Sequence, residues 1–148
     1  MRIFSGIQPT GRKHLGNHIG AIRQYVEGQA RAEAAGDIGI YCIVDRHATT
    51  VPYDPVELRE RVHDTTAILL AAGLDPERCV LFRQGDVREH TELCWLLGGV
   101  TAWGDLNRMT QWKVKREQIE EKTGAFVSAG LFNYPVLQAA DVDRKSVV

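Results

Sequence analysis

Polar donors, glycines and basic residues gather in one short segment, residues 8–17, which reads QPTGRKHLGN. A run of apolar residues precedes it and apolar residues at helical spacing follow, so we expect a turn between a buried strand and a helix. The first turn of a helix offers unpaired N–H groups and about half a positive charge, and Gly16 permits close approach to the backbone. His14 and Asn17 add side-chain donors. Such a turn is suited to binding a polyphosphate.

The same segment also has a purely structural interpretation. Gly11 and Gly16 could serve only to make a tight turn, with His14 as an ordinary surface residue. The segment matches neither a Walker loop nor the dinucleotide-binding pattern G-x-G-x-x-G. Both interpretations therefore stay open when this segment is taken alone.

Three strand-and-helix pairs are predicted to position the turn. We expect strands at residues 2–7, 38–44 and 79–82, and helices at about 16–34, from 55 to a stop at Gly73, and around residues 93–97. Asp54 and Asp86 are the predicted caps of the second and third helices. The polar residues 113–124 indicate either a mobile connection or a solvated helical arm.

The alternation of strands and helices predicts an α/β fold with a Rossmann-like, doubly wound parallel sheet. In such sheets, ligands bind beyond the carboxyl ends of the strands. The loops after Ile7, Val44 and Phe82 are therefore the places where binding residues are expected.

Composition restricts the class of protein. A chain of 148 residues with 44% hydrophobic residues is long enough for one domain, and its net charge of -1 gives no general attraction to DNA or other nucleic acid. Cys42, Cys79 and Cys94 are odd in number and widely spaced, which fits a reducing cytoplasm and neither a disulfide framework nor a zinc site. No run approaches the roughly 20 apolar residues that cross a bilayer. We expect no membrane association, no metal site and no tightly bound cofactor.

Residues 3–11 together with His14-Leu15-Gly16-Asn17 resemble the start of class I aminoacyl-tRNA synthetases, whose first motif has the form H-x-G-N in the tryptophanyl branch. The resemblance continues, in family order, through residues 45–49, 108–113, 128–131 and 134–141, and it covers Ile3 to Val142. It implies a tryptophan–tRNA ligase that joins tryptophan and ATP into tryptophanyl-adenylate and then charges tRNA. ATP would enter as its Mg²⁺ complex.

The resemblance also implies roles for individual residues. The ATP site would comprise Gln8, Pro9, Thr10, Gly16 and Asn17, and the catalytic donors would be His14 and Asn17. No general base is required, because the attacking tryptophan carboxylate is already ionised at neutral pH. Catalysis would come from positioning and from donors aimed at the growing phosphate charge.

Tryptophan recognition calls for an acceptor, because the indole N–H can only donate. The resemblance assigns that acceptor to Asp141 and adds Phe4, Tyr134 and His47 to the pocket. Each has a plainer alternative: an exposed aspartate at a helix end, an aromatic core residue, or a histidine that caps a loop. Trp95, Trp103 and Trp112 are interpreted as packing residues.

Beyond Asp141 the family continues with a G-x-D-Q segment, a K-M-S-K-S loop and a helical domain that reads the anticodon. We therefore expect residues 1–142 to be a partial catalytic domain and residues 143–148 to be a tail unlike the family, the product of a truncated reading frame. Such a chain alone is expected to aggregate and not to form the adenylate. Contacts with tRNA would come mainly from the later parts, and a homodimer would form through helices near residues 87–112.

Two other functions fit part of this pattern. A tyrosyl-tRNA synthetase-like enzyme would also use Asp141, to accept from the tyrosine hydroxyl. A non-catalytic nucleotide-binding module could keep the first half of the fold, although it would need neither the phosphate turn nor the indole acceptor.

Overall fold

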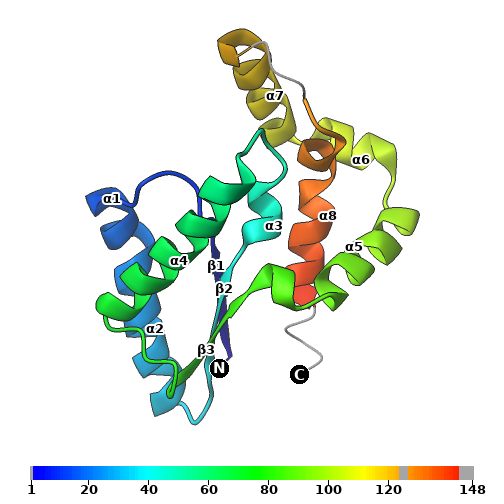
Figure 1. Ribbon diagram of the computed structural model, residues 1–148. Coiled ribbons are helices and arrows are strands. Elements are labelled where there is room, and N and C mark those ends of the chain that lie inside the picture. Colours follow the sequence, from blue (N-terminus) through cyan, green and yellow to red (C-terminus); the bar gives the residue numbers. More distant parts are fainter. Residues whose placement is uncertain (1, 124–126, 144–148) are drawn as a thin grey trace. The chain divides into compact units, whose positions relative to one another are not determined.

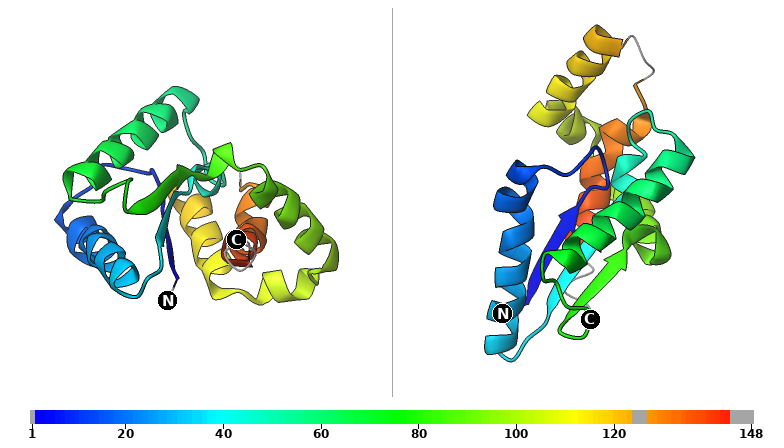
Figure 2. Two further views of the ribbon diagram at one scale, coloured as in Figure 1. Left: turned by 90° about the horizontal axis from the view of Figure 1, so that it is seen from below. Right: turned by 60° about the vertical axis from the view of Figure 1, so that its left-hand side comes forward.

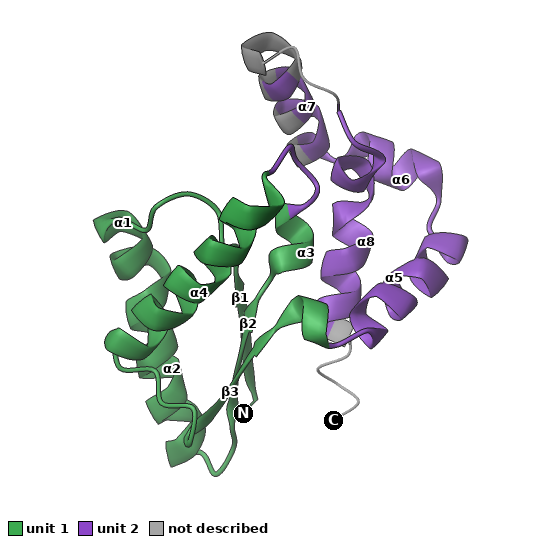
Figure 3. Cartoon of the chain, in the orientation of Figure 1, with its two compact units in different colours: residues 1–48, 54–86 green, residues 49–53, 87–148 purple. Residues whose placement is uncertain are grey.

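The computed structural model describes residues 2–123 and 127–143, which fall into two compact units (Figure 3). Unit 1 contains residues 1–48 and 54–86, and unit 2 contains residues 49–53 and 87–148. Most of the predicted tail, residues 144–148, lies outside the described residues. Along the part of the chain that is described, no helix combines the length and apolar character needed to cross a membrane.

Unit 1 is built on a parallel sheet of three strands in the order β1-β2-β3. The strands are β1 (Ile3–Ile7), β2 (Gly39–Ile43) and β3 (Cys79–Arg83), and Ile3 pairs with Gly39, which pairs with Cys79. The connecting helices α2 and α4 cover one face of the sheet (Figures 1 and 2). The predicted Rossmann-like parallel sheet is confirmed, and strand order does not reverse within these three strands.

The predicted first helix is one continuous helical segment with a local change of pitch. It comprises α1 (Leu15–Asn17), the π-helical turn η1 (His18–Ile22) and α2 (Arg23–Ala34). Its buried side chains recur at intervals of three and four residues, the spacing of one helix face: Ile22, Tyr25, Gln29 and Ala32. The segment therefore packs on the sheet, but with a different face from the predicted apolar one, because Leu15 and Ile19 of that pattern are 72% and 53% exposed.

The helices of unit 1 begin and end where the sequence signals place them. Asp54 caps α4 (Pro55–Ala71) by accepting from the backbone N–H groups of Val56 and Glu57, both at 2.8 Å. Gly36 and Gly73 follow α2 and α4 with positive φ values of 66° and 108°. In both cases backbone hydrogen bonds run back to the last turn of the helix, as in a Schellman motif.

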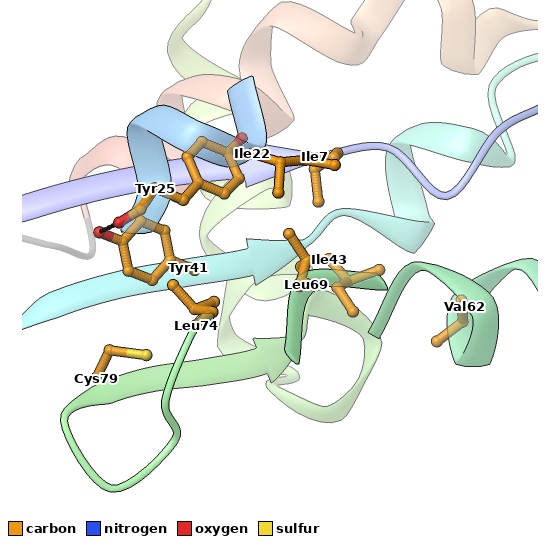
Figure 4. Close-up of a cluster of buried hydrophobic side chains, with 9 residues drawn as sticks. All are labelled: Ile7, Ile22, Tyr25, Tyr41, Ile43, Val62, Leu69, Leu74 and Cys79. Carbon is orange, nitrogen blue, oxygen red and sulfur yellow. Dashed lines mark hydrogen bonds between the residues drawn. The ribbon is translucent and has the colours of Figure 1, made fainter. Parts of the chain in front are cut away.

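The core of unit 1 centres on two stacked tyrosines (Figure 4). The rings of Tyr25 and Tyr41 lie 5.1 Å apart. The Tyr41 hydroxyl donates to the backbone carbonyl of Tyr25 at 2.8 Å, and the Tyr25 hydroxyl donates to that of Gly6 at 3.0 Å. Burial raises the pKa of Tyr41 to about 12. These bonds join α2 to β1 and β2 and satisfy both hydroxyls inside the core.

Unit 2 consists mainly of helices: α5 (Glu89–Val100), α6 (Trp103–Arg108), α7 (Thr110–Thr123) and α8 (Ala129–Asp143). Helices α5 and α8 pack along each other (Figure 3). The polar stretch that begins at residue 113 is helical up to Thr123, so the helical-arm alternative is correct for these residues. The Ser128 hydroxyl accepts from the Leu131 backbone N–H at 3.1 Å and so caps α8.

Two sequence predictions are wrong. Asp86 does not cap α5, because it lies in the short 3-10 turn η2 (Gln84–Asp86) and its carboxylate pairs with Arg83 instead. Trp95 is not a packing residue, since 83% of its surface is exposed, whereas Trp103, although 68% exposed, contacts the Phe132 ring at 6.2 Å. Trp112 does pack, edge-on against Phe132 at 5.1 Å.

Close packing at Gly28 generates a stability test. A Cβ atom at Gly28 would lie 2.9 Å from the Tyr41 hydroxyl oxygen. Gly28→Ala should therefore destabilise the chain by about 1–3 kcal/mol, the usual cost of overpacking a core. Urea unfolding followed by circular dichroism measures this loss.

Gly20→Ala is the matched control, because a Cβ atom there meets nothing within 4 Å. It should leave the urea midpoint unchanged or raise it, since alanine favours helix over glycine by about 1 kcal/mol. A Gly28→Ala midpoint equal to that of Gly20→Ala would contradict the proposed packing constraint.

Candidate functional site

The turn after β1 is closed by a lysine. Lys13 Nζ donates to the backbone carbonyl oxygens of Gln8 at 2.7 Å and Thr10 at 3.3 Å. Gln8 and Thr10 are exposed, whereas Pro9 is fully buried and anchors the turn. Gly11 has a φ of 63°, which glycine adopts without strain. The Lys13 ammonium therefore shapes the turn through its carbonyl groups.

The helix start that follows is held by a reciprocal cap. The backbone N–H of Gly16 donates to Nδ1 of His14 at 3.1 Å, and that of His14 donates to Oδ1 of Asn17 at 3.0 Å. A nitrogen that accepts a hydrogen bond carries no proton, so Nε2 bears the proton of the neutral imidazole. Asn17 likewise keeps its two amide N–H groups as donors. The cap thus leaves donors on both side chains.

Gly16 has a more local function than the sequence suggests. A Cβ atom there would lie 2.9 Å from Cε1 and 3.0 Å from Nδ1 of His14. The missing side chain therefore makes room for the His14 ring. Because His14 and Gly16 are exposed and Asn17 is half-buried, this end of the helix stays open to a ligand.

A shallow pocket adjoins this turn on the side of α4. The charged side chains that line this pocket are three cations and one carboxylate. The lining residues are Gly11, Arg12, Lys13, Arg61, Asp64, Thr65 and Ile68. Burial, and secondarily the charge of Arg61, lowers the pKa of Lys13. Positive charge at this position favours an anion beside the turn.

The loops after β2 and β3 are tied to each other inside unit 1. Oδ1 of Asp45 accepts from the Gly85 backbone N–H at 2.8 Å, and Oε1 of Gln84 accepts from the Arg46 backbone N–H at 3.1 Å. These bonds anchor the short helix α3 (Asp45–Ala48), in which His47 is 7% exposed. His47 therefore lies buried just beyond the carboxyl end of β2, on a short helix whose first residues are hydrogen-bonded to the loop after β3.

Phe4 lies outside the tyrosine-centred core. Ile7 belongs to that core, and the side chain of Ile3 lies close to Gly28 on α2. Because successive side chains of a strand point to opposite faces, Phe4 points to the face of the sheet that α2 does not cover. Phe4 is thus no member of the tyrosine-centred cluster, and its side chain is half-buried.

Unit 2 contains a buried contact between a histidine of α5 and an aspartate of α8. Nδ1 of His90 and Oδ1 of Asp141 lie 2.8 Å apart, and the two side chains are 3% and 4% exposed. The alternative of an exposed aspartate at a helix end is therefore wrong. Burial, followed by the charge of Asp141, raises the pKa of the Cys94 thiol one turn after His90. Tyr134 lies half-buried two turns before Asp141 on α8.

The predicted site residues divide between the two units. Unit 1 contains the turn, Phe4 and His47, and unit 2 contains Tyr134 and Asp141. Hydrogen bonds join His14, Gly16 and Asn17, and Lys13 links Gln8 with Thr10. Convergence of both sets on one tryptophan pocket stays a prediction.

Sequence reasoning missed His90, Gln84 and Asp45. Gln84 and His90 are buried polar residues, and their partners come from distant parts of the sequence. The His90 position carries no local signal, since it follows a charged stretch at the start of a helix. The described residues contain no group of three or more histidine, cysteine or acidic side chains arranged to hold a metal ion.

Comparison with known proteins identifies the family. The model of class I tRNA synthetases for tryptophan and tyrosine matches residues 1–144. The chain belongs to this family. Among curated relatives, tryptophan–tRNA ligase 2 of Streptomyces avermitilis is 51% identical over 143 residues, covering 95% of this chain and 40% of the relative. The tryptophan–tRNA ligase of Helicobacter pylori is 45% identical over 141 residues, with the same shares covered.

Solved structures show the same relationship. The tryptophanyl-tRNA synthetase of Campylobacter jejuni, complexed with ADP and tryptophan, matches with a TM-score of 0.85 and 37% identity, covering 96% of this chain and 41% of that one. The tyrosyl-tRNA synthetase of Archaeoglobus fulgidus, at 21% identity and a TM-score of 0.71, shares the fold. The chain spans about 40% of the length of these curated relatives.

The cap at the helix start predicts which ring nitrogen of His14 carries the proton. In the unsubstituted chain its neutral imidazole should carry the proton on Nε2. Gly16→Ala should displace the ring and abolish this preference, because the new methyl group would occupy the space of Cε1 and Nδ1. Proton-detected nitrogen NMR of the histidine rings distinguishes the tautomers.

Gly20→Ala again serves as the control, since it adds a methyl group to the same helical segment in open space. It should leave the His14 signals where they are. A proton on Nδ1 in the unsubstituted chain would refute the proposed cap.

Proposed function

We propose that this chain supplies the ATP turn and the indole acceptor of a tryptophan–tRNA ligase. Membership in the family and the tryptophan–tRNA ligases among its relatives support this proposal. The observation that carries it is the buried carboxylate of Asp141, 4% exposed on α8. Burying a carboxylate is costly, and a protein that served only as a scaffold would have no need of one here.

In the proposed first step, an oxygen of the tryptophan carboxylate attacks the α-phosphorus of ATP. A new P–O bond forms to the amino acid, the bond to the bridging oxygen breaks, and pyrophosphate leaves with the electron pair. No proton has to be removed from the nucleophile. The protein therefore contributes orientation and donors for the charge that develops on phosphate.

The donors would come from the capped helix start. Nε2–H of His14, the amide of Asn17 and the backbone N–H groups would meet the phosphates, while Gln8, Pro9 and Thr10 would line the nucleotide site. Because the cap uses Nδ1 of His14 and Oδ1 of Asn17, it orients both side chains before ATP arrives. We propose that Mg²⁺ enters bound to ATP.

The substrate amino acid would be recognised by Asp141, with Phe4, Tyr134 and His47 around the indole. Tryptophan is favoured over tyrosine because relatives at 45–51% identity are named tryptophan–tRNA ligases, whereas the tyrosyl enzyme resembles this chain only in fold. A site built around such a bond rejects analogues that lack the N–H group.

The remaining partners follow from the family. Charging requires tRNA, whose contacts we assign mainly to the parts of the relatives that this chain does not match. Cys42, Cys79 and Cys94 carry thiols that are not joined in disulfides, which supports a cytoplasmic location.

The activity is tested most directly in a completed chain. We define this as residues 1–142 joined to the part of the Streptomyces avermitilis relative that this chain does not match. It should catalyse tryptophan-dependent exchange between ATP and pyrophosphate. Lack of exchange, while the intact relative is active in the same assay, would contradict the proposed function.

Asp141→Asn should lower kcat/KM for tryptophan in the completed chain by about 10- to 150-fold, the range expected for losing a hydrogen bond to a charged group. The preference for tryptophan over its benzothienyl analogue, which has sulfur in place of the indole N–H, should fall as well. Asp105→Asn, at an exposed carboxylate of the same unit, is the control and should change neither quantity. An unchanged preference in Asp141→Asn would remove Asp141 from the recognition of the indole.

We also propose that unit 2 pairs with a second copy of the chain. Large apolar side chains are exposed on α5 and at the start of α6: Trp95 at 83%, Leu96 at 67%, Val100 at 83% and Trp103 at 68%. Exposed apolar side chains in such number are typical of protein interfaces. They lie within the residues expected to form the homodimer.

Trp95→Glu should convert the completed chain from dimer to monomer, because the new carboxylate would lose its water in an apolar interface. Sedimentation velocity measures the change. Val56→Glu alters an apolar residue of α4 that is 68% exposed, so it should leave the dimer intact. A completed chain that is monomeric without any substitution would rule out the pairing.

A further inference from the structure

The helical segment that follows the turn changes its hydrogen-bond spacing at η1 (His18–Ile22). The backbone N–H of Arg23 donates to the carbonyl of His18, five residues earlier, whereas an α-helix uses the fourth residue. Such a π-helical turn is rare and contains one residue more than an α-helical turn. The segment therefore has one extra residue between the turn after β1 and α2.

A regular α-helix does not account for the burial pattern of this segment. In an α-helix each residue is rotated by about 100° from the next, so side chains three and four positions apart share a face. Counted back from the buried Ile22, that face would contain His18, Ile19 and Leu15. All three are exposed, Leu15 by 72% and Ile19 by 53%.

The five-residue spacing of the π turn does account for the pattern. Asn17 lies five positions before Ile22, and it is half-buried while Gly16 and His18 on either side of it are exposed. The π turn thus brings Asn17 to the side of the helix on which Ile22 packs. This start of the helical segment lies toward the carboxyl ends of the strands, where parallel sheets bind ligands (Figure 1).

The donors of the cap follow the rotation of the helix. Oδ1 of Asn17 accepts from the His14 backbone, and Nδ1 of His14 accepts from the Gly16 backbone. Among the described residues, the hydrogen bonds of these two side chains stay within the cap. No bond to the sheet fixes their direction, so a rotation of the first turn about the helix axis would carry both donors with it.

We propose that the π turn His18–Ile22 is a positioning element that sets the direction of the His14 and Asn17 donors relative to the sheet. Its extra residue lets Ile22 pack in the core while Asn17 faces the same side. The inference rests on the proposed function, since it explains how these donors would be aimed at the phosphates of ATP. The number of residues carries this role, because a Cβ atom at Gly20 meets nothing within 4 Å.

Deletion of Gly20 distinguishes the π turn from a regular helix. It should shorten the turn to α-helical spacing and leave Asn17 four positions before Ile22, still on the same face. In the completed chain, kcat/KM for ATP in the exchange assay should stay within about threefold of the value without the deletion. In a regular helix the same deletion would rotate the first turn by about 100° and misdirect the donors.

An alanine inserted after Gly20 should have the opposite effect. It should rotate the first turn by about 100° and bring His18 to the position of Asn17. We expect kcat for exchange to fall by about 100-fold or more, the effect of losing a donor aimed at the transition state. The urea midpoint should change little, because α2 and its core residues keep their places. Gly20→Ala, which keeps the length, should retain full activity.

A deletion outside the π turn provides a stability control. Gln24 is an exposed residue of α2, and its deletion would move Ile22 out of the core. The urea midpoint of the completed chain should fall by about 1 M or more, since a large apolar side chain is lost from the core. Deletion of Gly20 should leave the midpoint nearly unchanged. This comparison requires no catalytic activity.

The outcomes separate the two proposals. A Gly20 deletion that lowers the midpoint as much as the Gln24 deletion, or that abolishes exchange, would overturn the role of the π turn. Full activity after the alanine insertion would overturn it too. If the completed chain lacks exchange without any change, the proposed function fails and the catalytic role of the π turn fails with it, whereas the packing of the segment is judged from the midpoints.

Discussion

The position of the helical segment 15–34 on the sheet governs unit 1, and that position depends on how closely side chains of the strands can approach the helix backbone at Gly28. The hydroxyl of Tyr41 fills the space where a Cβ atom of residue 28 would lie, and it donates to the Tyr25 carbonyl on the same helix. Tyr25 in turn donates to Gly6 on β1. The two tyrosines thus determine how far the helix lies from the sheet and where it lies along the strands. Since the turn joins β1 to this helix, the ends of the turn are fixed by the core.

A second constraint then acts on the polar residues of the turn: a buried or partly buried backbone group must find a partner. Lys13 satisfies carbonyl groups of the turn, while His14 and Asn17 satisfy N–H groups at the helix start. The bonds at the helix start use Nδ1 of His14 and Oδ1 of Asn17 as acceptors. They leave Nε2–H of His14 and the amide N–H groups of Asn17 as donors. Folding and ligand binding therefore draw on different atoms of the same residues, which explains how a short exposed segment can be ordered in advance of its ligand.

Unit 2 differs from unit 1 in that it buries the carboxyl group of an aspartate, Asp141. Asp141 lies where water cannot solvate its charge, and the first turn of a neighbouring helix brings His90 within 2.8 Å of it. Removing either partner alone would leave a polar group buried without its closest neighbour, a larger penalty than the pair itself contributes in stability. A pair of this kind is weak evidence for stability and better evidence for a requirement at that position, and the proposed recognition of an amino acid would supply such a requirement.

The sequence by itself determined the features that depend on neighbouring residues. Strand runs, the cap at Asp54, the glycine stops at Gly36 and Gly73 and the H-x-G-N turn are all set by contacts within a few positions, so their residue types predict them directly. The order of these motifs was also sufficient to indicate the family. Only the tertiary structure decided the partners that packing brings together. Asp86 pairs with Arg83 rather than capping α5, Trp95 lies on the surface rather than in the core, and Asp141 is buried against His90. The burial of a side chain depends on which other segment covers it, and no local pattern contains that information.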